Sequence, residues 1–239
     1  MGRTLQKIRS TALVLLVLGS SATAYAGTDT FGQITVVTDY LFRGVSQTMS
    51  SAALQGELGI EFENGWYGYV WASNVYFVER NAPDDGVRIE ANVGGGYSTA
   101  LNDRLTATIE ATSYLYPGAA AGVDYDYLEW HGMMALDDRH RLKIGYSEDV
   151  FNSGSDGLFY SLGTDWALTE YFGMFLELGH YDLEHAYDNS YSYGELAITG
   201  ASGSVGWRLS YLTVTDQAEE MFPESTVGDR IVVALSLSF

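Results

Sequence analysis

Apolar residues occupy every second position over long stretches of this chain, and the alternation continues to its last residue. In the C-terminal run RIVVALSLSF, the alternating apolar positions are Ile231, Val233, Leu235, Leu237 and Phe239. An extended strand turns successive side chains to opposite faces, so this run has one apolar face. Chain termini are usually solvated, so an apolar face that reaches the terminus needs a protein core or a lipid bilayer to lie against.

The same alternation recurs from Phe31 onward, interrupted by turn-forming sequences. It predicts about twelve strands of the roughly 9 to 11 residues that a β-segment needs to cross a bilayer. The strand from Trp66 to Val75 is aromatic on both faces, so its register stays open. The expected strands begin near Gln33, Ala52, Trp66, Val87, Leu105, Tyr125, Arg141, Leu158, Phe172, Tyr191, Ser204 and Arg230.

The connections between these strands alternate in length. The short ones are ENG (63–65), LND (101–103), DDR (137–139), LTEY (168–171) and GASG (200–203), whereas VERNAPDDG, DVFNSGSD, LEHAYDNS and TDQAEEMFPESTVGD are longer and acidic. Short periplasmic turns and longer extracellular loops are the layout of outer-membrane barrels. We therefore predict an all-β fold, a transmembrane antiparallel β-barrel formed by one domain over residues 27–239.

A soluble β-sandwich or barrel also alternates, but it turns its apolar face inward and its strands are usually shorter. The placement of the aromatic residues favours the membrane barrel, because it predicts one girdle at each bilayer interface. The aromatic residues expected at the lipid interfaces are Tyr40, Phe42, Tyr146 and Tyr211 on the outer side and Phe62, Tyr97, Trp166, Phe172, Trp207 and Phe239 on the periplasmic side.

Residues 1–26 have the features of a secretory signal peptide. Arg3, Lys7 and Arg9 precede the apolar run from Ala12 to Leu18, and Ala24-Tyr25-Ala26 forms a small-residue cleavage site. A single transmembrane anchor is the alternative, but it needs about 20 apolar residues and would leave the cleavage site unexplained. The chain has no cysteine, which excludes disulfides and thiol chemistry. We expect export to a bacterial outer membrane.

The charge of the chain narrows its partners. Its formal net charge is -19, and the predicted signal peptide holds three basic residues and no acidic one, so the mature domain is more acidic still. Nucleic acid is therefore excluded as a partner. The partners expected instead are outer-membrane lipid and lipopolysaccharide around the barrel, and small solutes or ions within it.

Three segments carry a family resemblance: TDYLFRGVSQT (38–48), ALQGELGIEFENGWYGYVWASNV (53–75) and YLYPG (114–118). In these segments the chain resembles the TorF-type porins of proteobacteria, and the likeness covers most of the mature chain. The resemblance implies an outer-membrane β-barrel porin, without supplying a substrate or a catalytic residue. The terminal Phe239 also resembles the signal by which the outer-membrane assembly machinery recognises the last strand of its clients.

The polar face of the predicted strands carries many charges, which a hydrocarbon slab tolerates only in a shared lumen. They could form a selectivity lining with acids in excess, or a paired network that fills the barrel. Small inward residues, including Gly59, Gly94, Gly96 and Gly163, favour an open lumen. The expected pore-lining residues are Asp39, Arg43, Gln55, Glu57, Glu61, Arg88, Glu90, Glu110, Glu129, Arg141, Lys143, Asp165, Glu177, Glu195, Arg208 and Arg230.

Enzyme chemistry is poorly supported. His131 beside Glu129 is the one histidine expected to face inward, and no GxSxG or HExxH motif occurs. His180 and His185 lie near acidic residues, but a solvated loop explains them better than a metal site. We expect no enzymatic activity, no catalytic residue, no metal and no cofactor.

The sequence thus predicts a small, cation-preferring porin for passive diffusion of hydrophilic solutes. Glu57, Glu90 and Glu110 are the residues expected to set the preference, because each lies in a cleanly alternating strand. The alternative is a non-conducting outer-membrane barrel with a structural, adhesion or receptor role through its acidic loops.

Overall fold

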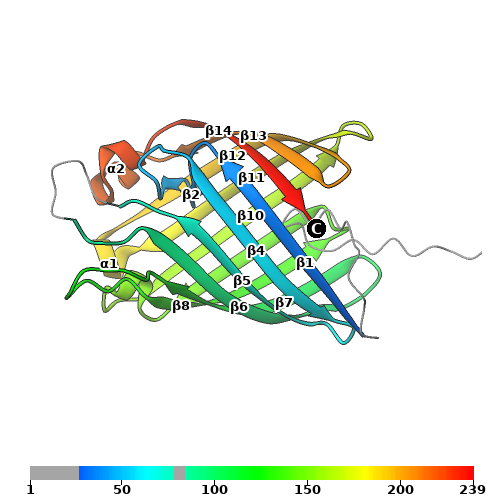
Figure 1. The fold of residues 1–239 in the computed structure, drawn as a ribbon, viewed down its shortest axis with the longest axis horizontal. Helices are drawn as coiled ribbons and strands as arrows, with labels where there is room; N and C mark the ends of the chain where they lie inside the picture. The colour runs from blue at the N-terminus through cyan, green and yellow to red at the C-terminus, as the bar shows by residue number, and fades with distance from the viewer. Residues whose placement is uncertain (1–26, 78–83) are drawn as a thin grey trace, which may run out of the picture.

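The computed structural model describes residues 27–77 and 84–239. The predicted signal peptide and part of the VERNAPDDG loop lie outside these residues. In the described part, twelve antiparallel strands close into a barrel (Figure 1), which confirms the predicted fold class. The barrel strands are β1 (Thr28–Val37), β4 (Ala53–Phe62), β5 (Trp66–Asn74), β6 (Ile89–Ala100), β7 (Leu105–Leu115), β8 (Tyr127–Leu136), β9 (His140–Ser147), β10 (Gly157–Ala167), β11 (Phe172–Leu183), β12 (Asn189–Ser202), β13 (Val205–Val214) and β14 (Arg230–Ser238).

The last strand closes the barrel against the first. β14 pairs with β1 from Gln33↔Ser238 to Val37↔Ala234. Beyond the strand, the Phe239 amide donates to the Gly32 carbonyl at 2.9 Å, and the Gly32 amide donates to the Phe239 carbonyl at 2.8 Å. No strand of the barrel is therefore left with an unpaired edge, which a span through hydrocarbon requires.

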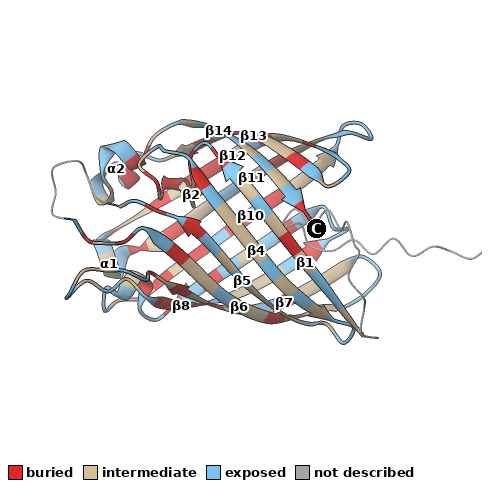
Figure 2. Cartoon of the chain, viewed as in Figure 1, coloured by how far each residue is buried: buried red, intermediate tan, exposed pale blue. Residues whose placement is uncertain are grey.

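The apolar faces of the strands point outward. Leu58, Ile109, Leu162 and Leu178 are each more than half exposed, as is Ile231 in the last strand. Along the strands of Figure 2, exposed positions alternate with less exposed ones. This arrangement is the reverse of a soluble barrel, and it leaves a continuous apolar belt that a lipid bilayer would cover. The apolar face of RIVVALSLSF therefore belongs to this belt and not to a core.

Aromatic side chains flank the belt at its turn end. Trp66 and Tyr97 lie with ring centroids 5.3 Å apart on the outer surface, and Phe172 and Trp207 lie 5.8 Å apart. β5 pairs with β4 and β6, and these pairings fix its register, which the sequence alone does not determine. Trp66 and Val70 are exposed on the outside, so the alternate residues Tyr67, Tyr69 and Trp71 face the lumen.

All short turns lie at one end of the barrel and the longer loops at the other (Figure 1). The loops contain a hairpin of β2 (Leu41–Phe42) and β3 (Val45–Ser46), two short helices, α1 (Glu184–Tyr187) and α2 (Gln217–Met221), and two 3-10 turns, η1 (Val150–Asn152) and η2 (Glu224–Thr226). No helix among the described residues is long and apolar enough to span a membrane.

Candidate functional site: the barrel lumen

The connection from β1 to β4 folds into the loop-side mouth of the barrel. We call residues 38–52 the plug hairpin. Its strands β2 and β3 pair with each other and with no barrel strand, and its tip turns at Arg43 and Gly44, where φ is 50° and 84°. Its base is fastened by Asp39, whose Oδ1 accepts hydrogen bonds from Ser46 Oγ at 2.5 Å and Thr48 Oγ1 at 3.0 Å.

The side chains of the plug hairpin reach the barrel wall in several directions. Tyr40 donates a hydrogen bond to Glu90 of β6 at 3.2 Å, and the Phe42 ring meets that of Tyr114 of β7 at 5.8 Å. The prediction that Tyr40 and Phe42 face lipid is therefore wrong. The alternating pattern continues past Val37 although the strand ends there, so both residues were assigned to a wall that they do not belong to.

Arg43 at the tip of the plug hairpin makes the deepest contact. Its guanidinium forms a two-point ion pair with Glu129 of β8, and the two side chains are 6% and 0% exposed. The guanidinium also lies 3.5 Å from the ring centroid of Phe159 and 4.3 Å from that of Tyr181. A buried charge is tolerated only where it is paired, and aromatic faces add to the attraction. The structure thus places Arg43 inside the lumen, on the plug hairpin and not on the wall.

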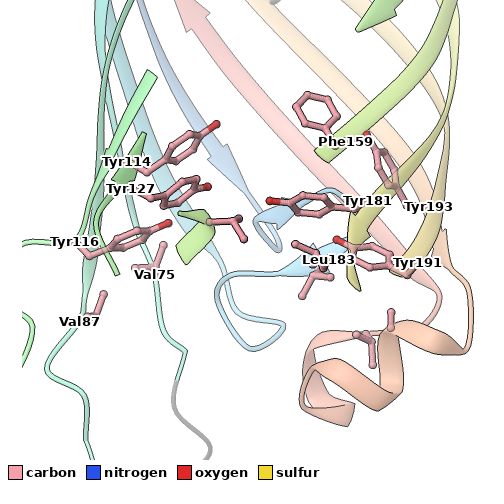
Figure 3. Close-up of a cluster of buried hydrophobic side chains, with 14 residues drawn as sticks. Val75, Val87, Tyr114, Tyr116, Tyr127, Phe159, Tyr181, Leu183, Tyr191 and Tyr193 are labelled. Atoms are coloured by element: carbon pink, nitrogen blue, oxygen red, sulfur yellow. The ribbon is translucent and has the colours of Figure 1, made fainter. Parts of the chain in front are cut away.

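An aromatic cluster surrounds the plug hairpin at this end of the lumen. Figure 3 shows Tyr114, Tyr116 and Tyr127 on one side facing Tyr181 and Tyr191 on the other. The Tyr114 and Tyr127 rings stack with centroids 4.5 Å apart. The buried members of the cluster that come from the plug hairpin and the loops are Val45, Val75, Val87, Tyr116, Val150, Ala218 and Val227. The loop-side half of the lumen is therefore packed and not open.

The small inward residues do not leave open space either. A side chain at Gly59 would meet the Phe31 ring at 2.1 Å, and one at Gly94 would meet the Tyr69 ring at 2.3 Å. These glycines allow aromatic rings to lie flat against the wall. A cavity of about 400 Å³ lies on the turn side of the plug hairpin, lined by Arg43, Glu110, His131, Lys143, Glu177 and Glu195 among others.

Most lumen bases are neutralised by an acidic neighbour. Arg141 pairs with Asp165, Lys143 lies 3.5 Å from Glu177, and Arg208 lies 2.7 Å from Glu195. At the base of the plug hairpin, Arg230 Nε lies 4.0 Å from Asp39 Oδ2. Together with the pair of Arg43 and Glu129, these contacts lie mainly between β8 and β13. This side of the lumen therefore carries little net charge.

Among the described residues, the acids on the opposite side of the lumen have no lysine or arginine partner. Glu110 accepts hydrogen bonds from Tyr67 at 2.6 Å and Tyr69 at 3.0 Å. Glu57 and Glu61, on β4 beside Gln55, form no ion pair with a lysine or arginine in the described part of the chain. The lumen thus has an acidic, tyrosine-lined wall over β4 to β7. The tyrosines of β5 were missed at the sequence level because aromatic residues occupy both faces of that strand.

Two further predicted lining residues, on or next to β6, do not line the open cavity. Glu90 is 2% exposed beneath the plug hairpin, where Asn92 also donates to it at 2.9 Å, so it does not line the open cavity. Arg88 precedes β6 and lies on the loop surface, where it bonds both carboxylate oxygens of Asp84 at 2.8 Å. Its prediction as a lining residue is wrong, because the loop acids hold its guanidinium outside the lumen. Hydrogen bonds from the Gly86 amide and from Arg88 lower the pKa of the Asp84 carboxyl.

The histidines do not converge on one centre. His131 Nε2 lies 3.3 Å from Glu129 Oε1 inside the barrel, whereas His180 contacts Ser192 and the ring of Tyr160. His185, in the loop region, bonds Asp156 at 2.6 Å, and this hydrogen bond raises the pKa of the imidazole. Within residues 27–77 and 84–239, no three metal-binding side chains gather.

Comparison with known proteins places the fold among porin structures. The NanC porin is 10% identical to this chain, with a TM-score of 0.54, and the match covers 88% of this chain and 99% of that chain. The KdgM porin in complex with disordered oligogalacturonate is 9% identical, with a TM-score of 0.52 and coverage of 89% and 99%. An outer-membrane channel from Pseudomonas putida F1 is 9% identical, with a TM-score of 0.53 and coverage of 93% and 98%.

The sequence itself matches one family model, described as "Bacterial protein of unknown function (Gcw_chp)", over residues 21–239. No curated protein matches the sequence. The structural matches share little sequence with this chain, so they establish the fold alone.

Proposed function

Because this chain belongs to the Gcw_chp family of bacterial proteins of unknown function, we infer its role from its own geometry, and we propose that it is an outer-membrane channel for small hydrophilic solutes with a preference for cations. The fold shared with outer-membrane porins and the resemblance to TorF-type porins support the class. The partners follow from the class: outer-membrane lipid and lipopolysaccharide around the belt, and the assembly machinery at the C-terminal strand.

The unequal pairing of the lumen charges carries the proposal. In the described part of the chain, the bases that face the cavity have acidic partners, while Glu57 and Glu110 form no ion pair with a lysine or arginine. Fixed charge of one sign in a narrow passage with low-dielectric walls focuses the field and concentrates counter-ions. A cation that enters the cavity therefore meets a net attractive wall, and an anion meets a repulsive one.

We expect selectivity to depend on Glu57 and Glu110. In a planar bilayer, the Glu57→Gln/Glu110→Gln variant should shift the reversal potential across a KCl gradient towards zero, because the unpaired negative charge is gone. The shift should shrink in high salt, since the Debye length falls from about 30 Å at 0.01 M to about 3 Å at 1 M. The matched control is Glu63→Gln/Glu170→Gln, which removes two exposed acids from the turns. An equal shift in the control would contradict a selectivity wall in the lumen.

The orientation of the barrel gives a second expectation. An epitope inserted in the loop that holds α2 should be reachable by antibody on intact cells, because long loops face the exterior in this architecture. An epitope at residues 63–65, in the turn between β4 and β5, should be reachable only after the outer membrane is permeabilised. Labelling of the second epitope alone on intact cells would reverse the proposed orientation.

The packed loop-side half of the lumen favours a second candidate, a non-conducting barrel that acts through its loops. The two candidates differ in a simple way. A channel must conduct when the plug hairpin leaves the lumen, whereas a structural or receptor barrel has no need to.

A further inference from the structure

We propose that the plug hairpin (residues 38–52) is a gate that leaves the lumen as one unit, and that the ion pair between Arg43 and Glu129 is the latch that holds it closed. This inference rests on the proposed channel function. It assigns a specific mechanical role to the segment TDYLFRGVSQT, which resembles the TorF-type porins and lies entirely in the plug hairpin.

The plug hairpin is built to move without unravelling the barrel. Its own backbone hydrogen bonds, such as that from the Gln47 amide to the Tyr40 carbonyl at 2.7 Å, remain within it. The twelve-stranded sheet is closed without β2 and β3. Beyond its base, the plug hairpin is joined to the other described residues by one backbone hydrogen bond, which the Tyr76 amide donates to the Gln47 carbonyl at 2.8 Å. Moving the plug hairpin out of the lumen therefore breaks mainly side-chain contacts and leaves the backbone hydrogen bonds of the barrel in place.

The backbone of the plug hairpin is held in conformations that L-residues seldom adopt. Arg43, Met49 and Ser50 have φ values of 50°, 51° and 60°. Such conformations persist only where surrounding contacts impose them, and they gather at switch segments. Positive φ occurs at the tip and again at residues 49–50, next to where the hairpin rejoins the wall. Contacts that hold the tip in place must therefore oppose this strain.

The latch is the contact best suited to that task. Arg43 joins the tip of the plug hairpin to Glu129 on β8, and both side chains are almost fully buried. Removing one partner of such a pair leaves an unpaired charge in the packed cluster, which strongly favours movement of that charge to water. Because Arg43 is on the mobile element and Glu129 is on the fixed wall, loss of the pair favours the displaced state.

The first test compares two charge-neutral double variants in planar bilayers. Arg43→Gln/Glu129→Gln removes the latch and leaves the net charge of the lumen unchanged. It should raise the fraction of time that the channel conducts by about tenfold, because two neutral amides bond to each other more weakly than the paired guanidinium and carboxylate do. The control, Arg104→Gln/Asp137→Asn, removes an exposed ion pair between two of the short turns, far from the plug hairpin and outside the cavity lining, so it should behave like the wild type.

A second measurement follows the plug hairpin without requiring conduction. The chain has no cysteine, so Val45→Cys introduces a single thiol at a position that is 5% exposed. Its labelling by a membrane-impermeant maleimide should be slow in the otherwise unchanged protein and about tenfold faster or more in the Arg43→Gln/Glu129→Gln background. The same thiol in the Arg104→Gln/Asp137→Asn background should stay protected.

The two measurements separate the gate from the channel. Faster labelling with no current in any variant would support the movement and overturn the channel function. Unchanged labelling and unchanged current in the latch variant would overturn the gate. Free conduction by the wild type while the thiol stays protected would also overturn it, because the plug hairpin would then not close the path.

Discussion

Replacing Leu209 with arginine should lower the free energy of unfolding of the barrel by roughly 2 to 4 kcal/mol. Leu209 lies on the outward face of β13, midway between Trp207 and Tyr211 on the same face, and is 45% exposed. Leu209 is the fifth of the ten residues of β13, so an arginine there lies near the middle of the bilayer. Its directly paired neighbours are Ile198 on β12 and Val233 on β14, so the residues beside it are apolar.

The matched control for this substitution lies on the same strand. Val205 also faces outward, is 50% exposed and begins β13 at the turn end. An arginine there reaches the interface, so Val205→Arg should cost only about 0 to 1 kcal/mol. Denaturant unfolding in lipid vesicles measures both values. Equal costs at the two positions would mean that the belt does not span the bilayer as described.

Replacing Gly179 with valine should destabilise the barrel by about 1 to 3 kcal/mol. Gly179 on β11 pairs directly with Tyr193 on β12, and the tyrosine ring covers the glycine so closely that a Cβ there would lie 2.2 Å from a ring atom. The added side chain must push the ring into the packed cluster, where Tyr193 is 8% exposed. Overpacking of this kind forces side chains away from their preferred rotamers.

Gly56→Val is the control for this second substitution. Gly56 faces outward on β4, and a Cβ there would meet nothing within 4 Å. Because valine favours extended backbone, this change should alter the stability by less than about 0.5 kcal/mol or raise it slightly. A loss at Gly56 as large as that at Gly179 would indicate that the backbone and not the ring contact requires glycine.

The strands could be predicted from the sequence because each one separates two different environments. Lipid outside and a polar lumen inside impose a strict period of two, and the predicted starts at Trp66, Leu105, Phe172 and Arg230 are the starts in the structure. The alternating turn lengths gave the end of the barrel at which each loop lies. These features depend on local pattern alone, which a single sequence contains.

The plug hairpin could not be predicted in the same way. Residues TDYLFRGVSQ alternate as a strand would, so Tyr40 and Phe42 were assigned to the outer wall. What redirects them is the turn at Arg43 and Gly44 and the distant partners Glu90, Tyr114 and Glu129. Those partners lie far along the chain, and alternation contains no information on them. The prediction that the inward glycines leave an open lumen is wrong for a similar reason, because the aromatic rings that cover these glycines come from other strands.

The central claim is that the lumen conducts and prefers cations, and the reversal potential across a KCl gradient tests it most directly. The measurement uses purified mature protein in a planar bilayer, with the wild type and the Arg43→Gln/Glu129→Gln variant, whose lumen has the same net charge. We expect a reversal potential of cation-selective sign in both proteins, with current flowing for a larger fraction of time in the variant. An anion-selective potential, or no current from either protein, would contradict the claim.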